Sequence, residues 1–245
     1  MIDFFNVSKS FSNNTVLNDI SFHVNRNDNV AIVGKNGCGK SVLLKIASGL
    51  IEPTFGNVLI NGEKISNIFF YNNDSISIGY VFQKGGLFDS MNIYDNIAFY
   101  LRRKNITERK IKDIVISNLT KVGLEGSENK MPSELSGGML KRAGLARVLA
   151  INPKVILYDD PTAGLDPVLT DSIADLILEI SKNENITSLT VTHDMKFAKK
   201  VSNKVLLLFN SKVVFWGDTS EFFLKNDIYA KQFINGDSEG PIGYL

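Results

Sequence analysis

Short apolar runs separated by polar turns fill the first third of the chain. Three of them precede a glycine-rich stretch: Ile2 to Val7, Val16 to Val24 and Val30 to Val33. Their length and their flanking turns are typical of strands, and we predict that these strands are partly antiparallel. Two more strands are expected after the glycine-rich stretch, within Pro53 to Gly62 and at Ile76 to Gln83.

The middle of the chain changes to a helical period. Apolar residues there recur at intervals of three and four: Ile111, Ile114, Val115, Leu119 and Val122. This spacing predicts a helix that starts near Thr107, a fair N-cap, and stops near Gly123. A second amphipathic helix is predicted at Lys141 to Ile151, and a third from about Val168 to Lys182.

Strands return in the last third. Val155 to Asp160 is an apolar strand that ends in two carboxylates, and Ser188 to Thr192 is a second one. The segments 205–209 and 212–216 flank Asn210-Ser211 and predict a β-hairpin. Gly217 to Phe233 is expected to be helical, and Gly236 to Leu245 is by default a frayed terminus.

The most specific motif is GxxxxGKS, from Gly34 to Ser41, between a buried strand and a helix. This is a P-loop in its required context. Its glycines let successive amides converge on phosphate oxygens, Lys40 should reach the β- and γ-phosphates, and Ser41 should ligate Mg²⁺. The alternative is a strand-to-helix turn that binds nothing. The predicted nucleotide-binding residues in and beside the loop are Gly34, Asn36, Gly37, Cys38, Gly39, Lys40, Ser41 and Val42.

The paired carboxylates at the end of VILYDD suit the same chemistry. Asp159 is expected to orient Mg²⁺ and its waters, and Asp160 the attacking water. The alternative is two acids that cap the next helix. A second helix start, Ser136-Gly137-Gly138, could also receive an anion, with Ser136 as N-cap and extra donor. Its alternative is a capped helix with flexible glycines.

Three other residues are candidates with strong structural alternatives. Phe11, in a polar setting, could stack on a purine, although most aromatic side chains are core residues. Gln83 ends a strand and precedes a mobile Lys84-Gly85-Gly86 loop, or is an ordinary solvated residue. His193 follows a strand at the edge where open α/β sheets bind ligands, although a lone histidine is more often structural.

Composition narrows the class of protein. The net charge is +1 with 22% charged residues, so a nucleic-acid partner is disfavoured. No apolar run approaches 18 residues and no signal peptide is recognised, which predicts a cytosolic chain or one on a cytosolic membrane face. The only cysteine, Cys38, excludes an intramolecular disulfide. Because it lies near a helix N-terminus, we expect its thiol pKa to be lowered.

The ordered motifs GKNGCGKS, Gln83, LSGGM, VILYDD, AGLD and VTHD resemble the nucleotide-binding domain of ABC transporters over nearly the whole chain. The resemblance implies an α/β fold: a P-loop NTPase (RecA-like) core with an antiparallel β subdomain and an inserted α-helical subdomain at about 86–150, all within residues 1–235. It implies an ATP hydrolase that uses ATP and Mg²⁺ and works as an ATP-sandwich dimer with a second copy of itself.

The same resemblance assigns residue roles. Phe11 is implied to stack on adenine, Gln83 to sense Mg²⁺ and contact the membrane partner, and His193 to contact the γ-phosphate. Ser136, Gly137 and Gly138 are implied to complete the other subunit's ATP site. Asp166 is implied to link the two sites.

Finer details are similar to the ATPase subunit of Mla/Mce-type phospholipid transporters. They are VFQKGGLFDSMNIYDNIAFYL, the methionine of LSGGM, the tyrosine of LYDDPTAGLDP, and the terminal GPI. This resemblance implies integral-membrane permease subunits and an MCE-type lipid-binding protein as partners, with the chain peripheral on the cytoplasmic face of the inner membrane. It also implies that the tail, 236–245, contacts a partner chain. The alternatives are the ATPase of a small-solute importer and a non-transport ATPase such as an iron-sulfur assembly factor.

One position departs from the family pattern. A glutamate usually follows the metal-binding aspartate, and this chain has Asp160. The missing methylene retracts the carboxylate by about 1 Å, and a misplacement of that size can cost on the order of 10²-fold in rate. Either the backbone compensates or hydrolysis is slow.

Overall fold

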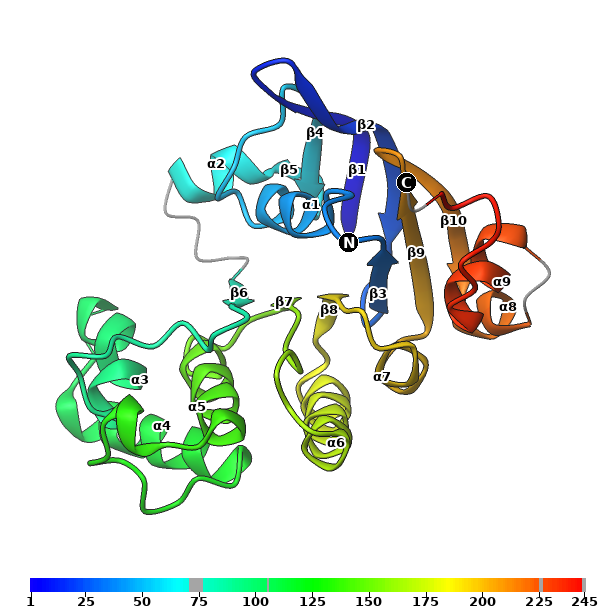
Figure 1. Ribbon diagram of the computed structural model, residues 1–245. Helices are drawn as coiled ribbons and strands as arrows, with labels where there is room; N and C mark the ends of the chain where they lie inside the picture. Colours follow the sequence, from blue (N-terminus) through cyan, green and yellow to red (C-terminus); the bar gives the residue numbers. More distant parts are fainter. Residues whose placement is uncertain (71–76, 105, 225–226, 244–245) are drawn as a thin grey trace.

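The computed structural model describes residues 1–70, 77–104, 106–224 and 227–243 and has an α/β fold (Figure 1). The larger sheet of the described part contains six strands in the order β10-β9-β3-β8-β7-β6. Their bounds are β3 Asn29–Gly34, β6 Ile78–Val81, β7 Val155–Asp159, β8 Thr187–Val191, β9 Lys204–Phe209 and β10 Lys212–Asp218. All neighbours are parallel except β9 and β10, which form the predicted hairpin.

A second, antiparallel sheet contains the N-terminal strands. In the described residues its order is β2-β1-β4-β5. The bounds are β1 Ile2–Phe11, β2 Asn14–Val24, β4 Phe55–Ile60 and β5 Glu63–Lys64, with the short helix α2 at Ile65–Phe70. Helix α1, Lys40–Ala47, shares one apolar core with both sheets through Leu43 and Leu44. Both sheets therefore fix the position of α1, the helix that follows the P-loop.

Three helices form a separate group, drawn in green at the lower left of Figure 1. They are α3 Ile93–Leu101, α4 Glu108–Lys121 and α5 Gly137–Leu149, with 3₁₀ turns at Arg102–Lys104 and Pro132–Glu134. Their core is continuous with that of α6, Pro167–Glu184, and α7, Met195–Val201. The antiparallel sheet, the parallel core and this helical group confirm the predicted fold class.

Strand β7 shows how the parallel sheet directs its side chains. Ile156 and Tyr158 belong to the core of the helical side, whereas Val155 and Leu157 belong to the core around α1. This alternation is the period-two pattern of any strand. Asp159 has the same parity as Leu157, so its side chain is directed to the α1 face.

One predicted strand is shorter than expected, and one predicted helix is wrong. The strand expected at Ile76 to Gln83 is present as β6, Ile78–Val81, so it ends two residues before Gln83, and Ile76 lies outside the described residues. The expected helix at Gly217 to Phe233 is a strand end followed by two helices, α8 Thr219–Phe223 and α9 Ile228–Asn235. Gly217 and Asp218 remain in β10 because they pair with Val205 and Lys204 of β9, and an ion pair of 2.9 Å joins Asp218 to Lys204.

The described part of the C-terminal tail folds back on α9. The Gln232 side chain accepts a hydrogen bond from the Ile242 amide at 2.7 Å and donates to the Ile242 carbonyl at 3.0 Å. Ile242 is 1% exposed. The Lys35 ammonium also donates to the Gly243 carbonyl at 3.1 Å. The default expectation of a frayed terminus is therefore wrong for residues 236–243.

Candidate functional site

The P-loop connects β3 to α1, and its backbone requires glycine. Gly34 has φ 148°, and a Cβ there would lie 2.3 Å from the Leu208 carbonyl oxygen. Gly39 has φ 103° and is the N-cap of α1, where a Cβ would lie 2.8 Å from Leu17. Gly37 has φ 79° and open space around it. The loop is thus tightly seated on its inner side and open at Gly37.

Lys40 is folded into this loop. Its ammonium donates to the carbonyls of Gly34 at 2.7 Å and Lys35 at 2.9 Å, and the residue is 5% exposed. Burial lowers the pKa of Lys40, while the charges of Cys38, Asp160 and Asp159 act in the opposite direction. A phosphate group above the loop offers this cation a charged partner in place of neutral carbonyls.

The environment of Cys38 differs from what the sequence predicted for its thiol pKa. Burial raises the pKa of its thiol, and this effect outweighs the opposing influence of Lys40 and the nearby amide hydrogen bonds. The prediction of a lowered pKa, based on the helix N-terminus, is therefore wrong. The sulfur packs against Gly34, at 2.9 Å from where a Cβ of that glycine would lie, so it fills the inner side of the loop.

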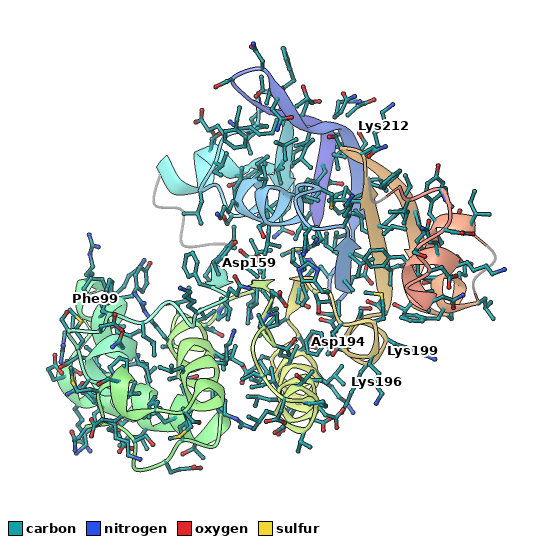
Figure 2. All side chains as sticks on the ribbon, viewed as in Figure 1. Phe99, Asp159, Asp194, Lys196, Lys199 and Lys212 are labelled. Carbon is teal, nitrogen blue, oxygen red and sulfur yellow. The ribbon has the colours of Figure 1, made fainter. Side chains whose placement is uncertain are left out.

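Asp159 ends β7 and lies below α1 in the view of Figure 2. Its two carboxylate oxygens have different partners. Oδ1 accepts from the Ser41 hydroxyl at 2.7 Å, and Oδ2 accepts from the Tyr80 hydroxyl at 2.9 Å. A hydroxyl and a carboxylate at this spacing are hard oxygen donors of the kind that Mg²⁺ prefers.

Asp160 leaves the strand in a left-handed conformation, φ 49°, with its amide bonded to the Val191 carbonyl at 3.0 Å. Oδ2 of its carboxylate lies 3.6 Å from Nε2 of His193, which follows β8. Burial raises the pKa of Asp160, although His193, Lys141 and Lys40 oppose the shift. Burial and Lys40 lower the pKa of His193, against the influence of Asp160.

A cavity of about 470 Å³ brings most of the predicted residues together. Its lining includes Phe11, Asn36, Gly37, Gly39, Lys40, Ser41, Val42, Gln83, Asp159, Asp160 and His193. Phe11 is 45% exposed at the mouth, with the Lys9 ammonium 5.0 Å from its ring centroid. A cavity of similar volume, about 460 Å³ between α4 and α6, is lined by neither a glycine-rich loop nor paired carboxylates. The P-loop cavity is therefore the candidate site.

Gly34 and Cys38, on the inner side of the P-loop, are not part of the cavity lining. Four further predicted residues lie outside that cavity and beside one another. Ser136 caps α5 by accepting from the Met139 amide at 3.4 Å. A Cβ on Gly137 would lie 3.8 Å from Leu165, and one on Gly138 would lie 3.6 Å from Leu169. Asp166 caps α6, because its carboxylate accepts from the amides of residues 168 and 169 at 2.9 Å. The two helix starts thus form a surface separate from the cavity of the same chain.

Helix α5 also contacts the loop that carries Gln83. The sequence did not predict this contact. The Lys141 ammonium donates to the Gln83 carbonyl, and the Arg147 guanidinium donates to the Gly86 carbonyl. Between them Gly144 contacts Gly85 so closely that a Cβ would lie 2.3 Å from the Gly85 oxygen. Lys141, Gly144 and Arg147 are three residues apart, so the sequence indicates that they share one face of α5. It does not indicate that this face contacts the Gln83 loop, because that contact depends on tertiary packing.

A glycine-rich loop, a buried lysine and paired carboxylates at the end of a parallel strand define a P-loop nucleoside triphosphatase. The family model for the ABC transporter matches residues 17–163, and the chain belongs to that family. It is therefore an ABC ATPase, an enzyme that hydrolyses ATP. No helix in the described ranges is long and apolar enough to cross a bilayer.

Several relatives support a finer comparison. The protein TRIGALACTOSYLDIACYLGLYCEROL 3, chloroplastic, of Arabidopsis thaliana is 39% identical over 100% of this chain and 76% of its own length. The intermembrane phospholipid transport system ATP-binding protein MlaF of Haemophilus influenzae is 33% identical over 100% of this chain and 94% of its own. The methionine import ATP-binding protein MetN 2 of Bacillus licheniformis is 37% identical over 98% of this chain and 72% of its own length.

A solved structure gives the same fold. The ATP-binding cassette MJ0796, in a dimeric post-hydrolysis state bound to ADP and Pi, has a TM-score of 0.81 and 27% identity. The match covers 89% of this chain and 99% of that one. The chain is thus an ABC ATPase, and its relatives include one named for intermembrane phospholipid transport and one named for methionine import.

Proposed function

We propose that this chain is the ATPase subunit of an ABC transporter that moves phospholipid between membranes. The observation that carries the proposal is the match to MlaF, which covers the whole of this chain and 94% of that relative. Methionine import is the runner-up, because MetN 2 is a relative of similar identity. Integral-membrane permease subunits and an MCE-type lipid-binding protein are the proposed partners, with the chain peripheral on the cytoplasmic face of the membrane.

The P-loop cavity binds ATP in this proposal. Phe11 stacks on adenine, and the amides of the P-loop bind the phosphates together with Lys40. The Lys40 ammonium then donates to phosphate oxygens in place of the carbonyls of Gly34 and Lys35. Ser41 and Asp159 would hold Mg²⁺, with Gln83 nearby. When bound, Mg²⁺ neutralises charge on the phosphate oxygens.

Asp160 and His193 act on the attacking water and the γ-phosphate. The Asp160 carboxylate accepts a hydrogen bond from the water, and His193 donates toward the phosphate. Ser136, Gly137 and Gly138 complete the site of a second copy, and Asp166 lies beside them. Two copies thus enclose two ATP molecules.

Reconstitution tests the proposal. The chain would be co-expressed with the permease and the MCE-type protein proposed as its partners, and the complex placed in phospholipid vesicles. We expect ATP-dependent transfer of a fluorescent phospholipid to the MCE-type protein, and loss of transfer with Asp160→Asn. The control is the same complex with methionine as solute.

Three results overturn the lipid assignment. If methionine stimulates ATP hydrolysis and phospholipid transfer is absent, the chain is a solute-importer ATPase. If active wild-type complex transfers phospholipid equally well without ATP, this ATPase does not drive the transfer. If the chain forms no complex with a permease and remains out of the membrane fraction, a non-transport ATPase is the better assignment.

A further inference from the structure

Tyr80 contacts a carboxylate that the proposed mechanism uses, yet no motif contains it. It lies in β6, and its hydroxyl is 2.9 Å from Oδ2 of Asp159. The other oxygen, Oδ1, accepts from Ser41 at 2.7 Å. One carboxylate is therefore held on two sides, by the helix that follows the P-loop and by the strand next to β7.

Strand register places Tyr80 there. Tyr80 pairs with Leu157 in the parallel ladder between β6 and β7, so both side chains lie on the α1 face. The Tyr80 hydroxyl then reaches Asp159, two residues further along β7. The ring packs against the core around α1, and its centroid lies 4.5 Å from that of Phe82. These contacts limit the positions that the hydroxyl can take.

The direction of the hydrogen bond is set by chemistry. An ionised carboxylate only accepts, so the Tyr80 hydroxyl donates. Burial, followed by the charge of Asp159 and the hydrogen bond itself, raises the pKa of Tyr80 well above its usual range.

We propose that Tyr80 is a positioning residue for the metal site: by binding Oδ2 of Asp159 it directs Oδ1 toward Ser41 and the Mg²⁺ that the two would hold. Carboxylates that serve metals are commonly fixed by such outer partners, whose removal costs roughly 10- to 100-fold in metal affinity or activity. This inference rests on the proposed Mg²⁺ site. It adds a residue whose effect passes through Asp159 and not through contact with nucleotide.

The test is Tyr80→Phe, which removes the hydroxyl and keeps the ring. The affinity of the purified full chain for a fluorescent ATP analogue is measured in excess Mg²⁺ and in EDTA, and the ratio of the two values reports the metal's contribution. We expect the ratio to fall roughly 10-fold in Tyr80→Phe, with the EDTA value unchanged. The matched control is Tyr100→Phe, since Tyr100 is 44% exposed on α3.

A second comparison separates positioning from a general structural role. In an Asp159→Asn background, Tyr80→Phe should change the ratio no further, because the hydroxyl acts through that carboxylate. An unchanged ratio in Tyr80→Phe, or an equal further fall in the Asp159→Asn background, overturns the Tyr80 proposal. A wild-type protein that binds ATP equally well with and without Mg²⁺ instead overturns the proposed metal site.

Discussion

Asp160 has a left-handed backbone, φ 49°, at the position where the family usually has glutamate. Aspartate adopts this region several-fold more often than most non-glycine residues. In this conformation Oδ2 of the carboxylate lies 3.6 Å from Nε2 of His193, although the side chain is one methylene shorter than that of glutamate. The backbone thus offers a route by which the shorter residue keeps a useful position.

We predict slow but real turnover in wild type, loss of turnover in Asp160→Asn, and faster turnover in Asp160→Glu. Asparagine keeps the shape and the left-handed preference but removes the charge that accepts the water's hydrogen bond. Glutamate restores the usual reach of the carboxylate. Steady-state ATPase rates of the three membrane complexes measure this. Equal rates in Asp160→Asn and wild type would mean that another group positions the water.

Asp160 should also make stability depend on pH. Burial raises its pKa in the folded, nucleotide-free chain, so its contribution to stability is present at low pH and is lost as pH rises through the folded pKa. Asp160→Asn should therefore melt at a higher temperature than wild type at pH values above the folded pKa of Asp160, and the gap between the two melting temperatures should shrink as pH falls through that pKa. Thermal unfolding followed by circular dichroism measures this. A gap that is constant with pH, or that widens at low pH, contradicts it.

Sequence predicted the residues whose signals are local. GxxxxGKS and the paired carboxylates lie within short stretches, and the structure brings them to one cavity. Tyr80 could not be predicted, because its contact with Asp159 depends on the register between two strands that are distant in sequence. The Cys38 pKa was predicted in the wrong direction, because burial by Gly34 and the rest of the loop is a tertiary property.

Helix α5 links the two loops that the proposed mechanism needs. Its first turn carries Ser136 at the N-cap, and its later turns hold the Gln83 loop through Lys141, Gly144 and Arg147. Burial lowers the pKa of both cations, whose donors reach carbonyls of the loop. Separation of loop and helix would leave buried donors without these partners, so the two should move together.

Gly144→Ala tests this contact, because the contact decides whether the substitution raises or lowers the stability of the protein. Alanine in place of glycine inside a helix ordinarily stabilises by about 1 kcal/mol. Here the new Cβ would lie 2.3 Å from the Gly85 carbonyl oxygen, so we expect lower stability in urea unfolding and slower ATP hydrolysis. A more stable variant with normal ATPase activity would show that α5 and the Gln83 loop are not closely coupled.

The sequence predicted helices with a clear period better than the C-terminal segment. The predicted helices near 107–122 and 168–182 correspond to α4 and α6. The segment after Trp216 has aromatic residues at spacings that also suit a helix, but pairing with β9 extends the strand to Asp218. Asp227 then starts a new helix by accepting from the amides of Tyr229 and Ala230. Such competition between strand pairing and helix formation is decided by tertiary contacts.

The predicted ATP-binding residues of the molecule are divided between two separate surfaces. The P-loop cavity is not lined by Ser136, and the helix starts at Ser136 and Asp166 lie together elsewhere. Val168, beside them, is 79% exposed. Because a helix N-terminus receives anions, this second surface suits the phosphates of an ATP bound to another copy. The domain limits, 1–235 with helices at about 86–150, remain predictions.

The central claim is that ATP joins two copies through these surfaces, and the molecular mass in solution tests it most directly. Light scattering would be measured on Asp160→Asn, which should bind ATP without hydrolysing it. We predict twice the monomer mass with ATP and Mg²⁺ and the monomer mass without nucleotide. Adding Gly137→Asp, which puts a carboxylate where phosphate should bind, should keep the protein monomeric while ATP still binds. A monomer with ATP bound to Asp160→Asn alone, or a dimer that survives Gly137→Asp, would contradict the account.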